Sequence, residues 1–222
     1  MTHILQQTLD GSHTIYIPEM EEHYHSTNGA IQEAIHIYIK KAFQYSSVEN
    51  PIVFEVGFGT GLNALLTALE AERTHRKTTF VSIEKYPLEQ EEYLALNYAE
   101  MLGAEALPLF SAMHTCAWNE FCQISEYFTL QKFHADLTTL PDIPNCDVIY
   151  FDAFAPNKQA SMWTEEIFRH LFAHTNPNGV LTTYCAKGDV RRMLQAVGYS
   201  VERTDGPKGK REILRATRIP LL

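Results

Sequence analysis

The sequence lacks the features that would place it in a membrane or in a disulfide-bonded fold. Its 222 residues contain no apolar run near the roughly 18 residues of a membrane span. The first twenty residues show no basic start followed by an apolar stretch, so no signal peptide is visible. The cysteines are scattered without CxxC spacing, which indicates reduced thiols in a cytoplasmic protein: Cys116, Cys122, Cys146 and Cys185.

Metal ligands at close spacing are also scarce. The chain has ten histidines, but only His23 and His25 stand close together, and no acidic or cysteine ligand accompanies them at metal-site spacing. We therefore expect no bound metal.

Linkers, internal repeats and low-complexity segments are absent as well. The length suits one α/β domain with a full core and is short for two. We expect a core domain over residues 51–222, with residues 1–50 forming an accessory layer packed on it.

The charge is unevenly distributed along the chain. The net charge is −9, yet residues 185–222 hold nine Lys and Arg against four Asp and Glu, so this end carries +5 and the remainder −14. A basic end on an acidic body permits local phosphate binding and argues against nucleic-acid binding over the whole surface. A solvated, salt-bridged surface explains the charges equally well.

The first fifty residues predict a hairpin followed by a helix. Ile4–Leu9 and His13–Ile17 flank Asp10-Gly11, a type I′ hairpin signal. Asn28 is a plausible N-cap, and apolar residues recur at helical spacing from there to about residue 43.

From Pro51 onward, strands and helices alternate. The expected strands are Ile52–Val56, Phe80–Ile83, Tyr127–Phe133, Val148–Phe151 and Gly179–Tyr184, and the expected helices cover 62–69, 88–98, 164–172 and 190–196. A final hairpin of Tyr199–Arg203 and Glu212–Thr217 adds one antiparallel strand. The order predicts a doubly wound, mainly parallel sheet, the seven-stranded Rossmann-like arrangement typical of class I methyltransferases.

A glycine-rich loop follows the first of these strands. Gly57, Gly59 and Gly61 allow the backbone to turn sharply and approach a ligand before a helix begins. A nicotinamide-binding loop needs glycine or alanine at position 62, where this chain has Leu62. GxGxG with Glu55 just before it fits S-adenosylmethionine better.

Two carboxylates end the next strands. Glu84 is placed to accept both ribose hydroxyls of the cofactor, and Asp136 to reach the adenine amino group. Each taken alone is also consistent with a helix cap or a solvent-facing carboxylate.

A third carboxylate, Asp152, directly follows the strand Val148–Phe151, where ligands bind in open α/β sheets. An aliphatic amine has a pKa of about 10.4 and needs help to lose its proton, so Asp152 suits chemistry on an amine. Lys158 follows, and Trp163 is either a stacking platform for a base or a core aromatic.

Several motifs together resemble the methyltransferase domain of the bifunctional MnmC family, which methylates 5-aminomethyl-2-thiouridine at the wobble position of tRNA. The matching segments are GFGTGLN (57–63), SIEKYPL (82–88), FDAFAPNKQASMW (151–163), NPNGVLTTYCAKGDVRRMLQAVGY (176–199) and GKRE (209–212). Upstream, Tyr24, Ser26, Gly29 and Glu33 resemble the family's entrance motif.

The resemblance implies a role for each matching residue. It assigns Asn63, Glu84, Lys85 and Asp136 to the cofactor site, Asp152 to catalysis, and Tyr24 and Ser26 to the substrate entrance. It also implies that the basic residues near the end face phosphates of the tRNA anticodon loop: Lys187, Arg191, Arg192, Lys208, Lys210 and Arg211.

The sequence departs from the family in three places. Gln159-Ala160-Ser161 replaces an Asn-Pro pair, and Pro177-Asn178-Gly179 replaces a Pro-Gly-Gly turn. The flavin-dependent oxidase of the bifunctional enzyme does not follow Leu222. We therefore expect a stand-alone methyltransferase whose aminomethyl substrate is supplied by another protein, such as a separate oxidase, or by another route.

Two other functions remain open from the sequence. An aminopropyltransferase of the spermidine-synthase kind shares the sheet, the sulfonium site and the acidic residue, although the basic end and Trp163 argue against a small polyamine substrate. A non-catalytic RNA-binding relative is the other alternative, against which Asp152 and the intact glycine loop argue.

Overall fold

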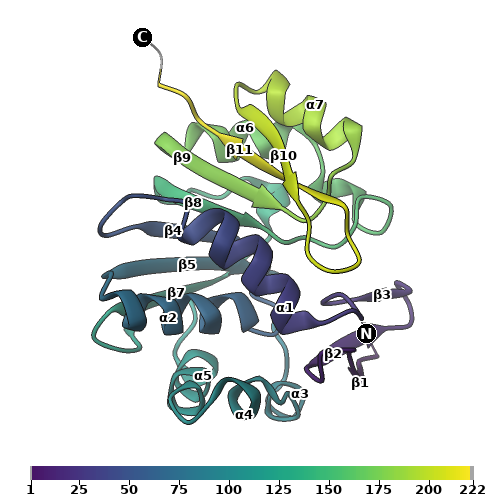
Figure 1. The fold of residues 1–222 in the computed structure, drawn as a ribbon, viewed down its shortest axis with the longest axis vertical. Coiled ribbons are helices and arrows are strands. Elements are labelled where there is room, and N and C mark those ends of the chain that lie inside the picture. Colours follow the sequence, from purple (N-terminus) through teal and green to yellow (C-terminus); the bar gives the residue numbers. More distant parts are fainter. Residues whose placement is uncertain (1, 221–222) are drawn as a thin grey trace.

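A computed structural model describes residues 2–220 and has a twisted central sheet as its frame (Figure 1). In the described residues this sheet has eight strands in the order β10-β11-β9-β8-β4-β5-β7-β6. The five central strands run parallel: β4 (Ile52–Val56), β5 (Thr78–Glu84), β7 (Phe128–His134), β8 (Cys146–Phe151) and β9 (Thr175–Thr183).

The two ends of the sheet are antiparallel. The hairpin of β10 (Ser200–Asp205) and β11 (Glu212–Thr217) joins through β11, which runs antiparallel to β9. This confirms the predicted class I methyltransferase order. A short edge strand, β6 (Phe121–Gln123), pairs antiparallel with β7 and was not predicted. Its three residues are too few to show a strand periodicity.

Helices cover both faces of the sheet, and the strand residues alternate between them. Val148 and Tyr150 of β8 join the core beneath α2 (Leu62–Thr74) and α5 (Ala106–Thr115). Their neighbours Ile149 and Phe151 point to the opposite core, beneath α6 (Glu165–Ala173) and α7 (Gly188–Ala196). The two-residue period of the strand thus fills two cores from one continuous apolar run.

The N-terminal fifty residues contribute directly to one of these cores. β1 (Ile4–Gln7), β2 (His13–Ile17) and β3 (Glu22–His23) form a separate small sheet. After it, α1 (Ala30–Ala34) continues into the π-helical segment η1 (Ile35–Phe43). Ile37, Tyr38 and Phe43 of η1 are fully or almost fully buried in the first core. The helical part of this segment is therefore a layer of the fold itself.

The predicted type I′ turn at Asp10-Gly11 is wrong. Residues 8–12 form a longer loop in which Gly11 has φ +88° while Asp10 is not left-handed, and a type I′ turn needs positive φ at both positions. Asp10 Oδ1 instead accepts a hydrogen bond from Ser12 N at 3.0 Å.

The predicted cap at Asn28 is also wrong, because the hairpin loop caps α1 from a distance. Gly29 occupies the N-cap position, and no side chain of its own caps the helix. Asp10 Oδ2 accepts a hydrogen bond from Gln32 N at 3.0 Å, and Ser12 Oγ accepts one from Ala30 N at 3.1 Å. The free N–H groups of the first turn are thus satisfied by residues 18 and 22 positions earlier in the chain.

The single helix predicted over 88–98 is two short helices, α3 (Gln90–Leu94) and α4 (Tyr98–Leu102). Asn97 lies at the break, where its side chain donates to Gly11 O at 2.9 Å and accepts from His13 N at 2.8 Å. Two 3₁₀ turns, η2 (Leu137–Thr139) and η3 (Ala160–Met162), follow β7 and β8. No helix in residues 2–220 has the length and apolarity to cross a membrane.

Candidate active site

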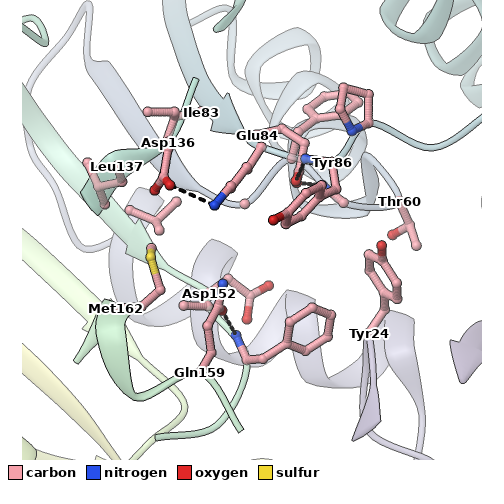
Figure 2. A pocket seen from close by; sticks show the side chains of 18 of the residues that line it. Tyr24, Thr60, Ile83, Glu84, Tyr86, Asp136, Leu137, Asp152, Gln159 and Met162 are labelled. Atoms are coloured by element: carbon pink, nitrogen blue, oxygen red, sulfur yellow. Dashed lines mark hydrogen bonds and ion pairs between the residues drawn. The ribbon is translucent and has the colours of Figure 1, made fainter. Parts of the chain in front are cut away.

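A cavity of about 700 Å³ lies where the carboxyl ends of β4, β5, β7 and β8 meet. Figure 2 shows Asp136 and Leu137 at one end, Tyr24 and Thr60 at the other, and Glu84 and Asp152 on opposite sides between them. The lining includes eight of the residues selected from the sequence: Tyr24, Gly57, Gly59, Asn63, Glu84, Lys85, Asp136 and Asp152.

The glycine loop adopts a backbone that other residues rarely tolerate. Gly57, Gly59 and Gly61 have φ of +89°, +50° and +73°. A Cβ on Gly59 would lie 3.1 Å from the Tyr24 ring, and one on Gly61 would lie 2.9 Å from His114 Nε2. Gly61 does not line the cavity itself, so its glycine serves the packing of the loop.

Two histidines hold Thr60 of this loop. His25 Nε2 lies 2.7 Å from Thr60 Oγ1, and His114 Nε2 donates to Thr60 O at 3.2 Å. Burial lowers the pKa of both imidazoles to about 4, so they are neutral at pH 7. These histidines support the loop, and no group of three His, Cys, Asp or Glu in the described chain is arranged to hold a metal.

Glu84 is fixed by the backbone around it. Its Oε2 accepts a hydrogen bond from Gly59 N at 3.0 Å and its Oε1 accepts one from Tyr86 N at 2.8 Å. A carboxylate oxygen can accept more than one hydrogen bond. The group is therefore oriented before a ligand binds, with acceptor capacity left toward the cavity.

Asp136 is at once a cap and a lining residue, so the two interpretations of its sequence position both apply. Oδ2 pairs with Lys85 Nζ at 2.8 Å, and Oδ1 accepts from Thr138 N at 2.9 Å at the start of η2. The hydrogen bond from Lys85, with further help from Thr138, lowers the pKa of this carboxyl to about 2. Lys85 thus reaches the cavity mainly as the partner of Asp136 (Figure 2).

Glu55, predicted to bind the cofactor, lies beneath the loop and not in the cavity lining. It is fully buried, and its Oε2 accepts a hydrogen bond from Ser82 Oγ at 2.7 Å. Burial raises the pKa of this carboxyl well above its usual value. The alternation of β4 directs this side chain away from the cavity, whereas the next residue, Val56, lines it.

Asp152 is held by two donors from different helices. Tyr38 Oη of η1 donates to Oδ1 at 2.6 Å, and Asn63 Nδ2 of α2 donates to Oδ2 at 2.9 Å. Burial raises the pKa of Asp152 to about 7, although both hydrogen bonds favour the carboxylate. The side chain therefore changes charge near neutral pH, as a general base requires.

The end of the cavity near Asp152 has an aromatic mouth. The rings of Tyr24 and Phe154 lie 5.2 Å apart at 80°, and Ile17 and Met20 extend the apolar lining. The cavity thus has a polar end with Asp136, an aromatic end, and Glu84 and Asp152 on opposite sides between them (Figure 2).

Comparisons with known proteins agree with this geometry. A family model described as S-adenosyl-L-methionine-dependent methyltransferase matches residues 118–219. The tRNA 5-methylaminomethyl-2-thiouridine biosynthesis bifunctional protein MnmC of Cupriavidus metallidurans is 30% identical over 240 residues, a match that covers 100% of this chain and 35% of that protein. The chain therefore spans about a third of the length of the MnmC relatives it matches.

Solved structures show the same fold. The crystal structure of MNMC2 from Aquifex aeolicus has a TM-score of 0.79 at 21% identity and covers 100% of this chain and 73% of that one. Spermidine synthase from Thermotoga maritima has a TM-score of 0.60 at 14% identity, over 97% and 72% of the two chains.

The chain is similar to S-adenosylmethionine-dependent methyltransferases over residues 118–219 and to MnmC over its whole length. Its cofactor is S-adenosylmethionine. The family model covers the segment with Asp152 and the closing hairpin, and the glycine loop lies outside it.

Two of the residues predicted to contact the substrate or tRNA, Trp163 and Ser26, make contacts within the protein instead. Trp163 is buried, donates from Nε1 to Phe154 O at 2.7 Å and packs between Phe151 and Phe168. It is the core aromatic of the two interpretations and does not offer a free face for a base. Ser26 does not line the cavity, and its backbone N donates to Glu33 Oε2 at 2.9 Å.

The predicted basic surface divides into exposed and internally paired residues. Lys187, Arg192, Lys208 and Arg211 are exposed, and Arg191 is half-buried. Arg192 pairs with Asp189 and Lys158 with Glu21. Lys210 is the exception, because it turns inward and pairs with Glu33.

Tyr38 is a site residue that the sequence does not single out, because it falls on the apolar face of the expected helix. A buried tyrosine hydroxyl needs a hydrogen-bond partner. A tyrosine on the apolar face of a helix is therefore the sequence feature that indicates such a contact. The partner itself, Asp152, lies 114 residues away in the chain.

Proposed function

We propose that this methyltransferase transfers a methyl group from S-adenosylmethionine to the exocyclic amine of 5-aminomethyl-(2-thio)uridine at the wobble position of tRNA. The observation that carries the proposal is Asp152, held by Tyr38 and Asn63 between the polar and the aromatic ends of one cavity. The relationship to MnmC supports the nature of the acceptor.

The polar end fits the cofactor. Glu84 offers two oriented oxygens for the ribose hydroxyls, and Asp136 offers an ionised carboxylate to the adenine amino group. Ile83, Leu137 and Met162 provide apolar surface around the base. Gly57 and Gly59 leave room for the amino-acid portion, and Asn63 lines the adjoining wall. When bound there, S-adenosylmethionine supplies a methyl group activated by a sulfonium.

The aromatic end fits the acceptor base. Sequence-specific RNA recognition commonly stacks an unpaired base on aromatic side chains, and Tyr24 with Phe154 offers such a surface. Asp152 then orients the aminomethyl group by pairing with its ammonium form. It accepts a proton from that nitrogen, which frees the lone pair for in-line displacement.

The exposed basic residues suit the phosphates around the target base. Lys187, Arg191 and Arg192 lie at α7, and Lys208 and Arg211 lie in the loop between β10 and β11. Figure 1 shows that this loop extends toward α1 and β3, beside the segment that carries Tyr24. We place the enzyme in the cytoplasm with the tRNA anticodon loop as partner and a separate oxidase as the source of the aminomethyl group.

The proposal is tested with purified protein, S-adenosylmethionine and tRNA that carries the aminomethyl group. Nucleoside mass spectrometry should show the gain of one methyl group on that uridine, which Asp152→Asn abolishes while cofactor binding persists. Matched tRNA without the aminomethyl group is the control. Equal methylation of both tRNAs, or of neither, contradicts the proposal.

The same assay separates the alternatives. An aminopropyltransferase releases methylthioadenosine, whereas a methyltransferase releases adenosylhomocysteine. The likeness to spermidine synthase is one of fold, and the aromatic mouth with its basic surroundings favours RNA over a small polyamine. A non-catalytic RNA-binding relative would show no cofactor binding by calorimetry.

A further inference from the structure

A half-buried ion pair lies beside the acceptor side of the cavity and joins two distant segments of the chain. Lys210 Nζ in the β10–β11 loop lies 2.5 Å from Glu33 Oε1 in α1. The two side chains are 31% and 12% exposed, so the pair is largely removed from water. Attraction between charges increases as solvent is excluded, which makes this pair different from the exposed pairs elsewhere on the surface.

Further contacts fix the pair and direct it toward Asp152. Glu33 Oε2 accepts from Ser26 N at 2.9 Å, and Lys210 Nζ lies 4.3 Å above the Tyr184 ring. Tyr184 Oη in turn donates to Ala153 O at 2.9 Å, one residue after Asp152. The ion pair and the catalytic carboxylate therefore belong to one packed cluster.

The groups around Asp152 come from seven parts of the fold. Tyr38 of η1, Asn63 of α2 and Tyr184 after β9 are uncharged, Glu55 of β4 is a buried carboxyl whose pKa is raised well above its usual value, and Glu84 of β5 lies across the cavity. Glu33 of α1 and Lys210 of the β10–β11 loop carry opposite charges and act on the Asp152 carboxyl in opposite directions. The two charges of the pair therefore offset one another while the pair is intact.

We propose that Glu33 and Lys210 are positioning residues that together set the pH at which Asp152 ionises and latch the β10–β11 loop to the entrance segment. This inference rests on the proposed function, in which Asp152 takes a proton from the acceptor amine. It gives Lys210 a role inside the protein, in place of the phosphate contact expected from the sequence.

The direction in which the pKa of Asp152 shifts depends on which partner of the ion pair is removed. Lys210→Met leaves the Glu33 carboxylate uncompensated, which keeps Asp152 protonated to higher pH. Glu33→Gln leaves the Lys210 ammonium uncompensated, which ionises Asp152 at lower pH. A single uncompensated charge near a carboxyl shifts its pKa by about one unit or more. The double variant Glu33→Gln/Lys210→Met removes both charges and should return the midpoint near its original value.

The experiment measures the pH profile of kcat/KM with aminomethyl-bearing tRNA for both single variants and the double variant. The low-pH limb should move up by about one unit for Lys210→Met and down by about one unit for Glu33→Gln. Arg203→Met removes half of another ion pair, Arg203–Glu212, on the same hairpin, and should leave the midpoint in place. Shifts in one common direction, or none, overturn the inference.

Two further measurements keep the result interpretable. The conservative variants Glu33→Asp and Lys210→Arg keep both charges and should keep the midpoint of the pH profile. A shift in these variants as large as in the neutral variants would indicate a packing effect and overturn the inference. Carbon-13 NMR titration of the Asp152 carboxyl in the free protein reads the same midpoint without substrate. Opposite NMR shifts in a protein that does not methylate tRNA would refute the proposed function alone, whereas methylation with unshifted NMR midpoints would refute this inference alone.

Discussion

Asp152 makes the stability of this protein depend on pH in a way that Asp152→Asn should remove. The pKa of its carboxyl is about 7 in the folded protein against 3.8 for an unperturbed aspartate. The unfolded chain therefore loses this proton at lower pH than the folded protein does. As pH rises from about 4 to about 7, the free energy of unfolding falls through this group, and above pH 7 the loss is complete.

The size of the effect follows from the two pKa values. A difference of about 3 units corresponds to about 4 kcal/mol of lost stability above pH 7, of which about 2.6 kcal/mol develops between pH 5 and pH 8. Asp152 is partly exposed to the cavity, so solvent screening reduces the change in unfolding free energy between pH 5 and pH 8. We expect about half of the full value, about 1 to 2 kcal/mol.

The assay is urea-induced unfolding of the wild type and of Asp152→Asn at pH 5 and pH 8, without cofactor. The variant should gain about 1 to 2 kcal/mol relative to the wild type between the two pH values. Loss of the hydrogen bond from Tyr38 or Asn63 adds a constant offset that cancels in this comparison. Asp142→Asn, at a fully exposed carboxylate, is the control. If the difference in unfolding free energy between the variant and the wild type is the same at both pH values, Asp152 is not a buried carboxyl that titrates near neutral pH.

Three other substitutions test the site. Glu84→Gln should weaken cofactor binding about tenfold in calorimetry, because it removes the charge from the ribose acceptor, and unchanged affinity would exclude Glu84 from the cofactor site. Trp163→Phe should cost about 1 kcal/mol of unfolding free energy through the lost bond to Phe154 O and leave tRNA affinity intact; a loss of tRNA affinity would restore a stacking role. Gly61→Ala combines a positive φ with a contact of 2.9 Å and should destabilise more than Gly103→Ala, which has a positive φ but open space around it. Equal losses in thermal unfolding would mean that the contact is relieved at no cost.

The parallel sheet and the carboxylates at its edge were predictable from the sequence. Residues 148–151 of β8 form a continuous apolar run, which is how strands buried on both faces appear. The chain order then places the ends of successive strands at one edge. Glu84, Asp136 and Asp152 follow directly from this rule, because each ends or follows such a strand.

The misplaced features depend on contacts between segments far apart in the chain. Asn97 interrupts a helix because its side chain binds the hairpin loop at Gly11 and His13. The spacing of apolar residues along the sequence does not indicate such a distant partner. Lys210 was counted with the exposed basic residues because its charge is visible in the sequence, whereas its partner Glu33, 177 residues away, is not.

The same burial that shifts Asp152 also acts on the proposed acceptor. A desolvated environment disfavours a charged group, so it raises the pKa of a carboxyl and lowers that of an ammonium. In water an aliphatic ammonium and an aspartate differ by about 6.5 pKa units, which makes proton transfer to the carboxylate unfavourable by about 9 kcal/mol. Because the pKa of Asp152 is about 7, about half of this pKa difference is removed before the proposed substrate binds. Entry of the amine into the same cavity lowers its own pKa and closes more of it. The hydroxyl of Tyr38 and the amide of Asn63 then supply the only direct polar contacts that the described side chains make with the carboxylate. Since neither of them carries a charge, the carboxylate keeps its own charge unpaired by these two contacts, and the ammonium of the proposed acceptor is a cation with which it can pair.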